Sequence, residues 1–189
     1  MIKLMRFLGI ATAVAALLAS AALAGDCPLS PGFEGLNTAV KGFPVPRTSP
    51  VQGVDYLDVE QVAGLIESPD HVFIDVRPAG FFKACRLNGS TNLEYTFAGE
   101  GGEAMYKSGP RLTREALEAY LQEGKTAVLF CNDAFSKTGC HRAANAAITA
   151  VCTWGLPGER IKWFGDGVSG SVAQMPELTS GTLCRKPWH

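Results

Sequence analysis

The stretch VLFCNDAFSKTGCHRAANAA, from Val128 to Ala147, passes from apolar to polar to small residues. Its apolar start belongs to a run over 126–130 that suits a buried parallel strand. Its alanine-rich end opens a helix, expected over 142–154, whose small side chains allow close packing against a sheet. Cys131 stands where the strand ends and Arg142 where the helix begins. This order of strand, loop and helix is a building unit of α/β proteins.

The segments on either side repeat the same alternation. The expected strands are 56–57, 71–75 (HVFID), 91–93, 126–130 and 161–164 (IKWF). The expected helices are 58–66, 78–83 (a helical turn), 113–124 and 142–154. Asp58 and Thr113 can cap the N-termini of two of these helices. The pattern predicts an α/β domain with a central, mostly parallel sheet of five strands flanked by helices.

The N-terminus is typical of a secretory signal peptide. Lys3 and Arg6 precede an apolar run over 7–23, which closes on the small-x-small pattern Ala22-Leu23-Ala24. We expect cleavage after Ala24 and a periplasmic or secreted protein; an uncleaved membrane anchor is the alternative. The expected organisation is a signal peptide over 1–24, an N-terminal extension over 25–50, one domain over 51–175 and a C-terminal tail over 176–189.

The net charge excludes some classes of binding partner, and the length indicates the number of domains. Removing Lys3 and Arg6 from the 17 basic residues leaves 15 against 18 acidic ones, so the mature chain is slightly acidic. We therefore expect no nucleic-acid partner, and no membrane partner after signal cleavage. The 165 residues from Gly25 to His189 are enough for one domain with a substantial core.

The position of Cys131 predicts a reactive thiol. The loop after a buried strand directs backbone N–H groups inward, and the following helix adds partial positive charge. Arg142 adds a full charge, so we expect Cys131 to ionise readily and to act as a nucleophile. Asp75 also ends a buried strand, and in parallel sheets ligands bind at the carboxyl ends of strands.

These segments resemble the rhodanese family. FIDVRPAGFFKACRLNGSTNL, over 73–93, is similar to the family's Asp-x-Arg strand end and the segment after it, with Asp75, Arg77 and Arg86 at matching positions. The opening stretch resembles the family's strand, catalytic cysteine, loop, arginine and Ala-rich helix, and IKWFGDGVSGSV resembles its closing strand and turn. The resemblance covers roughly 51–172 and implies a rhodanese-like fold.

The resemblance also implies a sulfurtransferase. Cys131 would accept a sulfane sulfur as a persulfide from a small anionic donor such as thiosulfate and pass it to a thiophilic acceptor. Arg142 would orient the loop and favour the anion, Asp75 would brace the base of the site, and Arg86 would attract the donor. That cycle needs no metal or organic cofactor, and a periplasmic protein is a candidate partner. The expected substrate-binding residues are Arg86, Asn132, Ser136, Lys137, Thr138 and Gly139.

The loop departs from the family pattern. Ten residues, 132–141, separate Cys131 from Arg142, more than in common single-domain rhodaneses, and one of them is a second cysteine, Cys140. Three interpretations of Cys140 stay open: a resolving thiol, a permanent disulfide partner of Cys131, or an incidental loop residue. A metal site is not expected, because only Cys140 and His141 are contiguous and no second ligand pair has metal-binding spacing.

The remaining cysteines suggest disulfides in an exported chain. Cys27 and Cys184 lie in the two terminal segments, so we expect them to pair and tie the extension to the tail. Cys152 is expected to be a core cysteine or a partner of Cys85.

Two other functions remain alternatives to an exported sulfurtransferase. A non-catalytic rhodanese-like binding or carrier module would be favoured by a permanently bonded Cys131. A dithiol redox protein of a periplasmic oxidation pathway would use Cys131 and Cys140 together.

Overall fold

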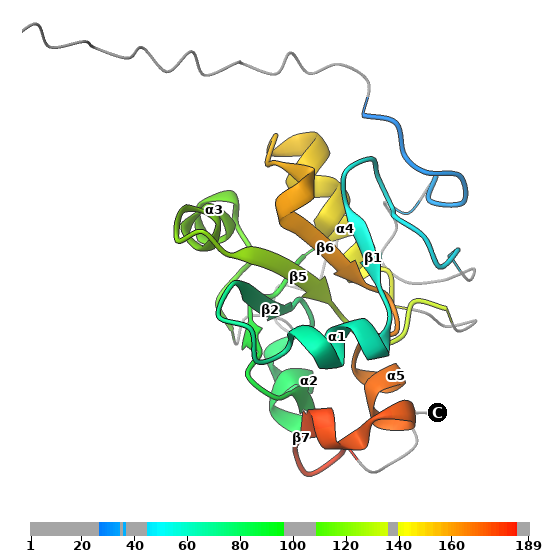
Figure 1. Ribbon diagram of the computed structural model, residues 1–189, viewed down its shortest axis with the longest axis vertical. Helices are drawn as coiled ribbons and strands as arrows, with labels where there is room; N and C mark the ends of the chain where they lie inside the picture. Colours follow the sequence, from blue (N-terminus) through cyan, green and yellow to red (C-terminus); the bar gives the residue numbers. More distant parts are fainter. Residues whose placement is uncertain (1–26, 35, 37–44, 97–108, 136–139, 185–189) are drawn as a thin grey trace, which may run out of the picture.

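The computed structural model describes residues 27–34, 36, 45–96, 109–135 and 140–184. Its central sheet consists of parallel strands (Figure 1). The strands are β1 (Asp55–Leu57), β2 (His71–Asp75), β3 (Arg86–Leu87), β4 (Thr91–Asn92), β5 (Thr126–Phe130), β6 (Ile161–Phe164) and β7 (Thr179–Ser180). The α-helices are α1 (Val59–Leu65), α2 (Ala79–Ala84), α3 (Arg114–Gln122), α4 (Arg142–Ile148) and α5 (Gly167–Gln174). A π-helical turn (Thr149–Thr153) continues α4, and 3₁₀ turns span Gly158–Arg160 and Pro176–Leu178.

The central sheet has five strands in the order β1-β6-β5-β2-β4, and every neighbouring pair is parallel. This confirms the predicted α/β class with a five-stranded parallel sheet. β5 lies in the middle, with Val128 paired to Phe73 of β2 and to Lys162 of β6. An apolar run such as TAVLF fits this place, because a central parallel strand is covered on both faces.

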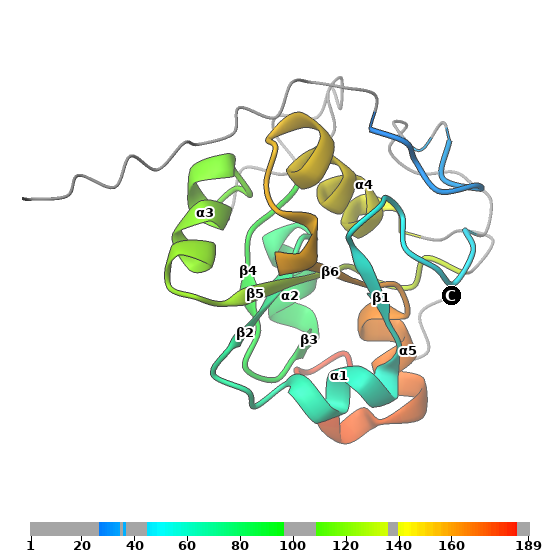
Figure 2. The same cartoon turned by 45° about the horizontal axis from the view of Figure 1, so that its top comes forward.

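Helices cover both faces of the sheet. Figure 2 shows α3 and α4 on one side of the strands and α1 and α5 on the other. The first layer buries Leu117, Leu129 and Trp163 with the alanines of α4. The layer of α1 and α5, on the other face, buries strand residues whose side chains point to that face. These are Phe73, Val128, Phe130 and Phe164, which pack with Val62 and Val168. The five carboxyl strand ends thus meet at one edge, where the polar segments after β2 and β5 lie side by side.

The chain after β6 forms structure that the sequence pattern does not predict. α5 follows β6 directly, and β7 pairs antiparallel with β3, joining Thr179 to Leu87 and Ser180 to Arg86. Part of the expected tail therefore packs on the domain. Within the described ranges, none of the helices combines the length and the hydropathy that a membrane span requires.

Candidate functional site

The end of β5 holds Cys131 in the interior. Its side chain is 1 % exposed, and its carbonyl oxygen accepts a hydrogen bond from Val168 N of α5 at 3.0 Å. Gly167 makes this contact possible: its φ is +56°, and a Cβ there would collide with the carbonyl oxygens of Cys131 and Asn132. The start of α5 therefore fixes the backbone that carries Cys131.

The loop after Cys131 folds back on itself. Cys140 N donates to the carbonyl oxygen of Asp133 at 2.8 Å, and Ala134 N donates to that of Gly165 at 2.9 Å. The first of these hydrogen bonds joins the two described ends of the loop. The chain at residue 140 therefore lies beside the end of β5 again. Cys131 Sγ lies 2.7 Å from the carbonyl oxygen of Cys140. Cys131 and Cys140 are therefore direct neighbours.

Both of these thiols are free in the structure, with Cys131 buried and Cys140 half-buried. Burial raises the pKa of the Cys131 thiol well above its usual value, and the neighbouring Cys140 side chain raises it further. A backbone N–H of Ala143 and the charge of Arg77 oppose this increase. The direction of this shift is opposite to the one that the sequence-based expectation of a readily ionised Cys131 requires. For the pKa of Cys131, the effect of burial is larger than the opposing effect of the charge of Arg77.

The pKa of Cys140 shifts in the opposite direction. The hydrogen bond from the Cys131 thiol is the largest cause that lowers the pKa of Cys140 to about 7, and it acts against the burial of Cys140. Backbone N–H groups of Asn132 and Arg142 and the charge of Arg142 lower it further. The one Cys131 proton has two acceptors within reach, the carbonyl oxygen of Cys140 at 2.7 Å and the Cys140 sulfur.

Arg142 is held inside the site. Its side chain is only 6 % exposed, and Nη1 donates to the carbonyl oxygen of Tyr95 at 2.6 Å. The charge of Arg142 lowers the pKa of Cys140 and is not among the causes that shift the pKa of Cys131, so its expected role toward Cys131 stays a prediction.

A buried ion pair forms the base of the site. Asp75 Oδ2 lies 2.6 Å from Nη2 of Arg77, and both side chains are at most 1 % exposed. Arg77 also donates through Nη2 to the carbonyl oxygen of Cys85 at 2.6 Å and through Nη1 to Asn132 Oδ1 at 2.7 Å. Asp75 thus braces Arg77, and Arg77 holds the residue that follows Cys131. Sequence reasoning did not include Arg77 among the site residues, although the Asp-x-Arg pattern pointed to it.

The predicted substrate-binding residues are only partly placed. The Asn132 side chain accepts from Arg77. Arg86 lies on β3 with its guanidinium carbon 5.6 Å from the Phe82 ring centroid, so its contact with a donor stays a prediction. The other four residues lie outside the described residues: Ser136, Lys137, Thr138 and Gly139.

The predicted pairing of Cys27 with Cys184 is wrong. Cys27 bonds to Cys152, and Cys85 bonds to Cys184, so the alternative pairing of Cys152 with Cys85 is wrong too. The reason is the sheet between them, because Cys27 packs in the layer of α4 and Cys184 in the layer of α5. Each terminal segment is bonded on its own face of the sheet.

The N-terminal extension reaches the site loop. Arg47 Nη1 lies 2.6 Å from Asp166 Oδ1, and its guanidinium stacks 3.9 Å from the Phe135 ring centroid. Tyr56 donates to Asp166 Oδ2 at 2.8 Å, and this carboxylate and burial raise the pKa of Tyr56 to about 12. No sequence pattern predicted this cluster, which joins the extension, β1, the site loop and the turn before α5.

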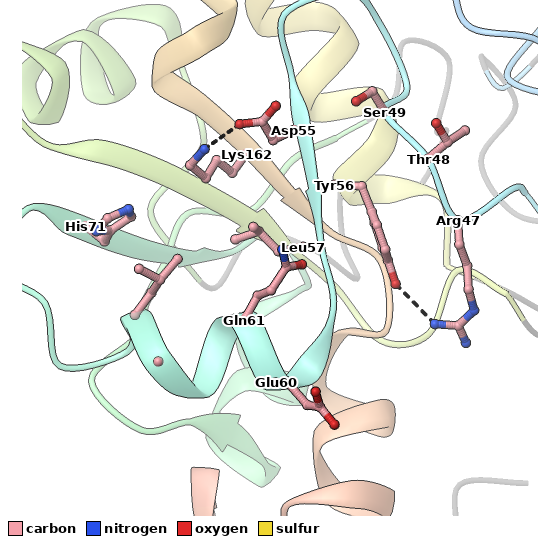
Figure 3. A pocket seen from close by; sticks show the side chains of 12 residues that line it. Arg47, Thr48, Ser49, Asp55, Tyr56, Leu57, Glu60, Gln61, His71 and Lys162 are labelled. Atoms are coloured by element: carbon pink, nitrogen blue, oxygen red, sulfur yellow. Dashed lines mark hydrogen bonds and ion pairs between the residues drawn. The ribbon is translucent and has the colours of Figure 1, made fainter.

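A surface hollow of about 750 Å³ lies away from the thiols (Figure 3). It is bounded by β1, α1 and the starts of β2 and β6, and an ion pair between Asp55 and Lys162 crosses it. Its lining contains none of the predicted site residues. In the described part of the chain, no group of three or more His, Cys, Asp or Glu side chains is placed to hold a metal ion.

The chain was compared with known families, proteins and structures. A sequence model described as a rhodanese-like domain matches residues 58–156, just over half of the chain. No curated protein matches the chain. Among solved structures, an As–Sb reductase from Leishmania major is similar, with a TM-score of 0.47 and 18 % identity over 67 % of this chain and 84 % of the other. A structural-genomics protein from Bacillus halodurans has a TM-score of 0.44 and 18 % identity over 67 % of this chain and 77 % of the other.

Proposed function

Because the chain belongs to the rhodanese-like domain family, we propose that it is an exported sulfurtransferase that carries a sulfane sulfur as a persulfide on Cys131. The observation that carries this proposal is the thiol pair at the carboxyl end of the central strand, where Cys131 contacts Cys140. Two positive side chains, Arg77 and Arg142, lie within electrostatic reach of the pair. Asp75 compensates the charge of Arg77, so the charge of Arg142 is the one that supports a small anionic donor such as thiosulfate.

Sulfur uptake begins with loss of the Cys131 proton. The Cys131 proton passes to the neighbouring Cys140 sulfur or to water, so a variant without Cys140 still takes up sulfur. Cys131 then attacks the outer sulfur of thiosulfate, the S–S bond of the donor breaks, and sulfite leaves with the bonding electrons. A thiophilic acceptor takes the outer sulfur of the persulfide and returns Cys131 to its thiol form.

Intact-mass measurement of two variants tests this proposal. Incubated with thiosulfate, Cys140→Ser is expected to gain one sulfur atom and to yield thiocyanate with cyanide. Cys131→Ser is expected to gain none. A sulfur atom retained by Cys131→Ser would move the site to another cysteine, and no sulfur on either variant would contradict a sulfurtransferase.

A dithiol redox protein is the second candidate, favoured by the contact between two free thiols. It would exchange a Cys131–Cys140 disulfide with a partner and show a measurable reduction potential. The absence of any sulfur adduct together with such a potential would select it.

Two observations support the export part of the proposal. The apolar segment before Ala24 has signal-peptide character, and two disulfides suit an oxidising compartment. We expect the exported protein to begin at Gly25, which N-terminal sequencing checks. A cytosolic protein that retains residues 1–24 would contradict export.

A further inference from the structure

The thiols at the strand end differ from the other cysteines of the chain. Four cysteines form two disulfides, whereas Cys131 and Cys140 are neighbours and stay reduced. The Cys131 sulfur is in hydrogen-bonding contact with residue 140, and the bond from Cys140 N to the Asp133 carbonyl keeps that residue in place. Two thiols held together without being bonded are arranged for a reversible reaction with each other.

We propose that Cys140 resolves the Cys131 persulfide, so that the protein releases hydrosulfide and works as a thiosulfate reductase driven by an external dithiol. This inference rests on the proposed function, because it needs the persulfide on Cys131. It adds a second reacting residue, names the acceptor as a dithiol and names the product.

The step is an ordinary thiol–disulfide exchange. The Cys140 thiolate attacks the inner sulfur of the persulfide, which is Sγ of Cys131, the residue whose side chain interacts with that of Cys140. A bond forms between Cys131 and Cys140, and the bond from Cys131 to the outer sulfur breaks. Hydrosulfide leaves with the electron pair, so the sulfane sulfur is reduced and the two cysteines are oxidised. An external dithiol then reduces the Cys131–Cys140 disulfide and becomes a disulfide itself.

The surroundings of the two residues assign these roles. Cys131 is enclosed, which protects a persulfide there from water and from large acceptors. Cys140 is the less buried residue of the pair, so we assign to it the exchange with the external dithiol. A thiol with a pKa near ambient pH attacks best in such exchanges, and the pKa of Cys140, about 7, meets that condition.

The experiment follows one turnover. Protein in which the Cys131–Cys140 pair is shown to be reduced by thiol titration is mixed with equimolar thiosulfate, then alkylated and digested with trypsin. Cleavage after Lys125, Lys137 and Arg142 puts Cys131 in peptide 126–137 and Cys140 in peptide 138–142. The wild-type protein is expected to release one hydrosulfide per chain and to yield these two peptides joined by a disulfide.

The variants separate this inference from the proposed function. Cys140→Ser is expected to keep the extra sulfur on peptide 126–137 and, with excess dithiothreitol, to release hydrosulfide about a hundredfold more slowly than the wild type, because the neighbouring attacking thiol is gone. Cys140→Ala serves as a second variant without a hydroxyl. Retention of both structural disulfides and an unchanged midpoint of thermal unfolding show that each variant is folded.

Two outcomes would overturn the resolving role. A wild-type protein that keeps a stable persulfide, without hydrosulfide or the joined peptides, would contradict it and leave the sulfurtransferase intact. Equal hydrosulfide release by the wild type and Cys140→Ser would assign the release to direct attack by the external dithiol. Failure of Cys140→Ser to take up sulfur would instead reject the proposed function.

Discussion

At the scale of single residues, the two thiols differ in burial and in pKa. Cys131 is the more buried thiol and its pKa is raised, whereas the pKa of Cys140 is lowered. A cysteine buried at a strand end does not ionise readily when its main neighbours are apolar, even with arginines nearby. The hydrogen bond from Cys131, two backbone N–H groups and the charge of Arg142 all act on Cys140 and lower its pKa to about 7. The sequence predicts that both cysteines lie near the site. It does not predict which of them has the lowered pKa, because that depends on which thiol the folded loop encloses.

This difference in pKa predicts different reactions with iodoacetamide. Since the pKa of Cys140 is about 7, its thiolate fraction and its alkylation rate are expected to rise with pH through about 7. Cys131, whose pKa is raised by burial, is expected to stay unmodified in that range. Peptide mapping across pH 5–10 measures both rates.

The Cys131→Ala variant tests whether the hydrogen bond from Cys131 lowers the pKa of Cys140. It removes the hydrogen bond that contributes most to the lowered pKa of Cys140, so the midpoint of Cys140 alkylation is expected to move toward its ordinary value near 9. A midpoint unchanged from the wild-type protein would show that the backbone N–H groups and Arg142 carry the effect alone.

A second residue-scale prediction concerns Asp75. Asp75→Ala leaves Arg77 buried without its counter-ion, so the free energy of unfolding is expected to fall by about 3–5 kcal/mol in urea titrations. Asp55→Ala is the matched control, because it breaks an ion pair with Lys162 in which the Asp55 side chain is 66 % exposed. That change is expected to cost less than about 1 kcal/mol, and equal losses from the two changes would contradict the bracing role of Asp75.

At the scale of elements, most of the predicted strands and helices are present because their signals are local. Asp58 caps α1 and Thr113 caps α3, each with a side-chain hydrogen bond to the third residue of the helix. α5 gave no such signal, because GVSGSVAQ contains two glycines, which are poor helix formers. Val168 and Ser171, which pack against the rest of the molecule, provide the stabilisation that the local sequence lacks.

Gly167 tests the contact between α5 and the site loop. In Gly167→Ala, the new methyl group meets the carbonyl oxygens of Cys131 and Asn132 as well as the strain of a positive φ. The control Gly155→Ala has the same kind of backbone, with φ +68°, but nothing within 4 Å of the new Cβ. Both are expected to lose about 1–2 kcal/mol from strain, and Gly167→Ala is expected to lose further stability through the collision and to lose thiocyanate formation as well. Equal activity in the two variants would show that the contact does not position Cys131.

At the scale of the whole molecule, the two disulfides join segments far apart in the chain. They span 125 and 99 residues and lie on opposite faces of the sheet. The sequence indicates that cysteines pair but not which ones, because pairing depends on the face of the sheet to which each terminal segment returns. The backbone bond from Leu183 N to the carbonyl oxygen of Ala84 at 3.1 Å brings Cys184 beside Cys85.

Each disulfide is expected to contribute to stability but not to sulfur uptake. The double variants Cys27→Ser/Cys152→Ser and Cys85→Ser/Cys184→Ser are each expected to lose about 2–5 kcal/mol of unfolding free energy. Both disulfides are separate from the pair of free thiols that reacts, so sulfur uptake per folded chain is expected to match that of the wild type. Loss of uptake in a folded double variant would place that disulfide in the site.

The central claim is that the transferred sulfur resides on Cys131, and peptide mapping of thiosulfate-treated, alkylated Cys140→Ser protein tests it most directly. The account predicts one extra sulfur on peptide 126–137, which is lost as thiocyanate when cyanide is added before alkylation. An extra sulfur on any other cysteine-containing peptide, or none on 126–137, would contradict it.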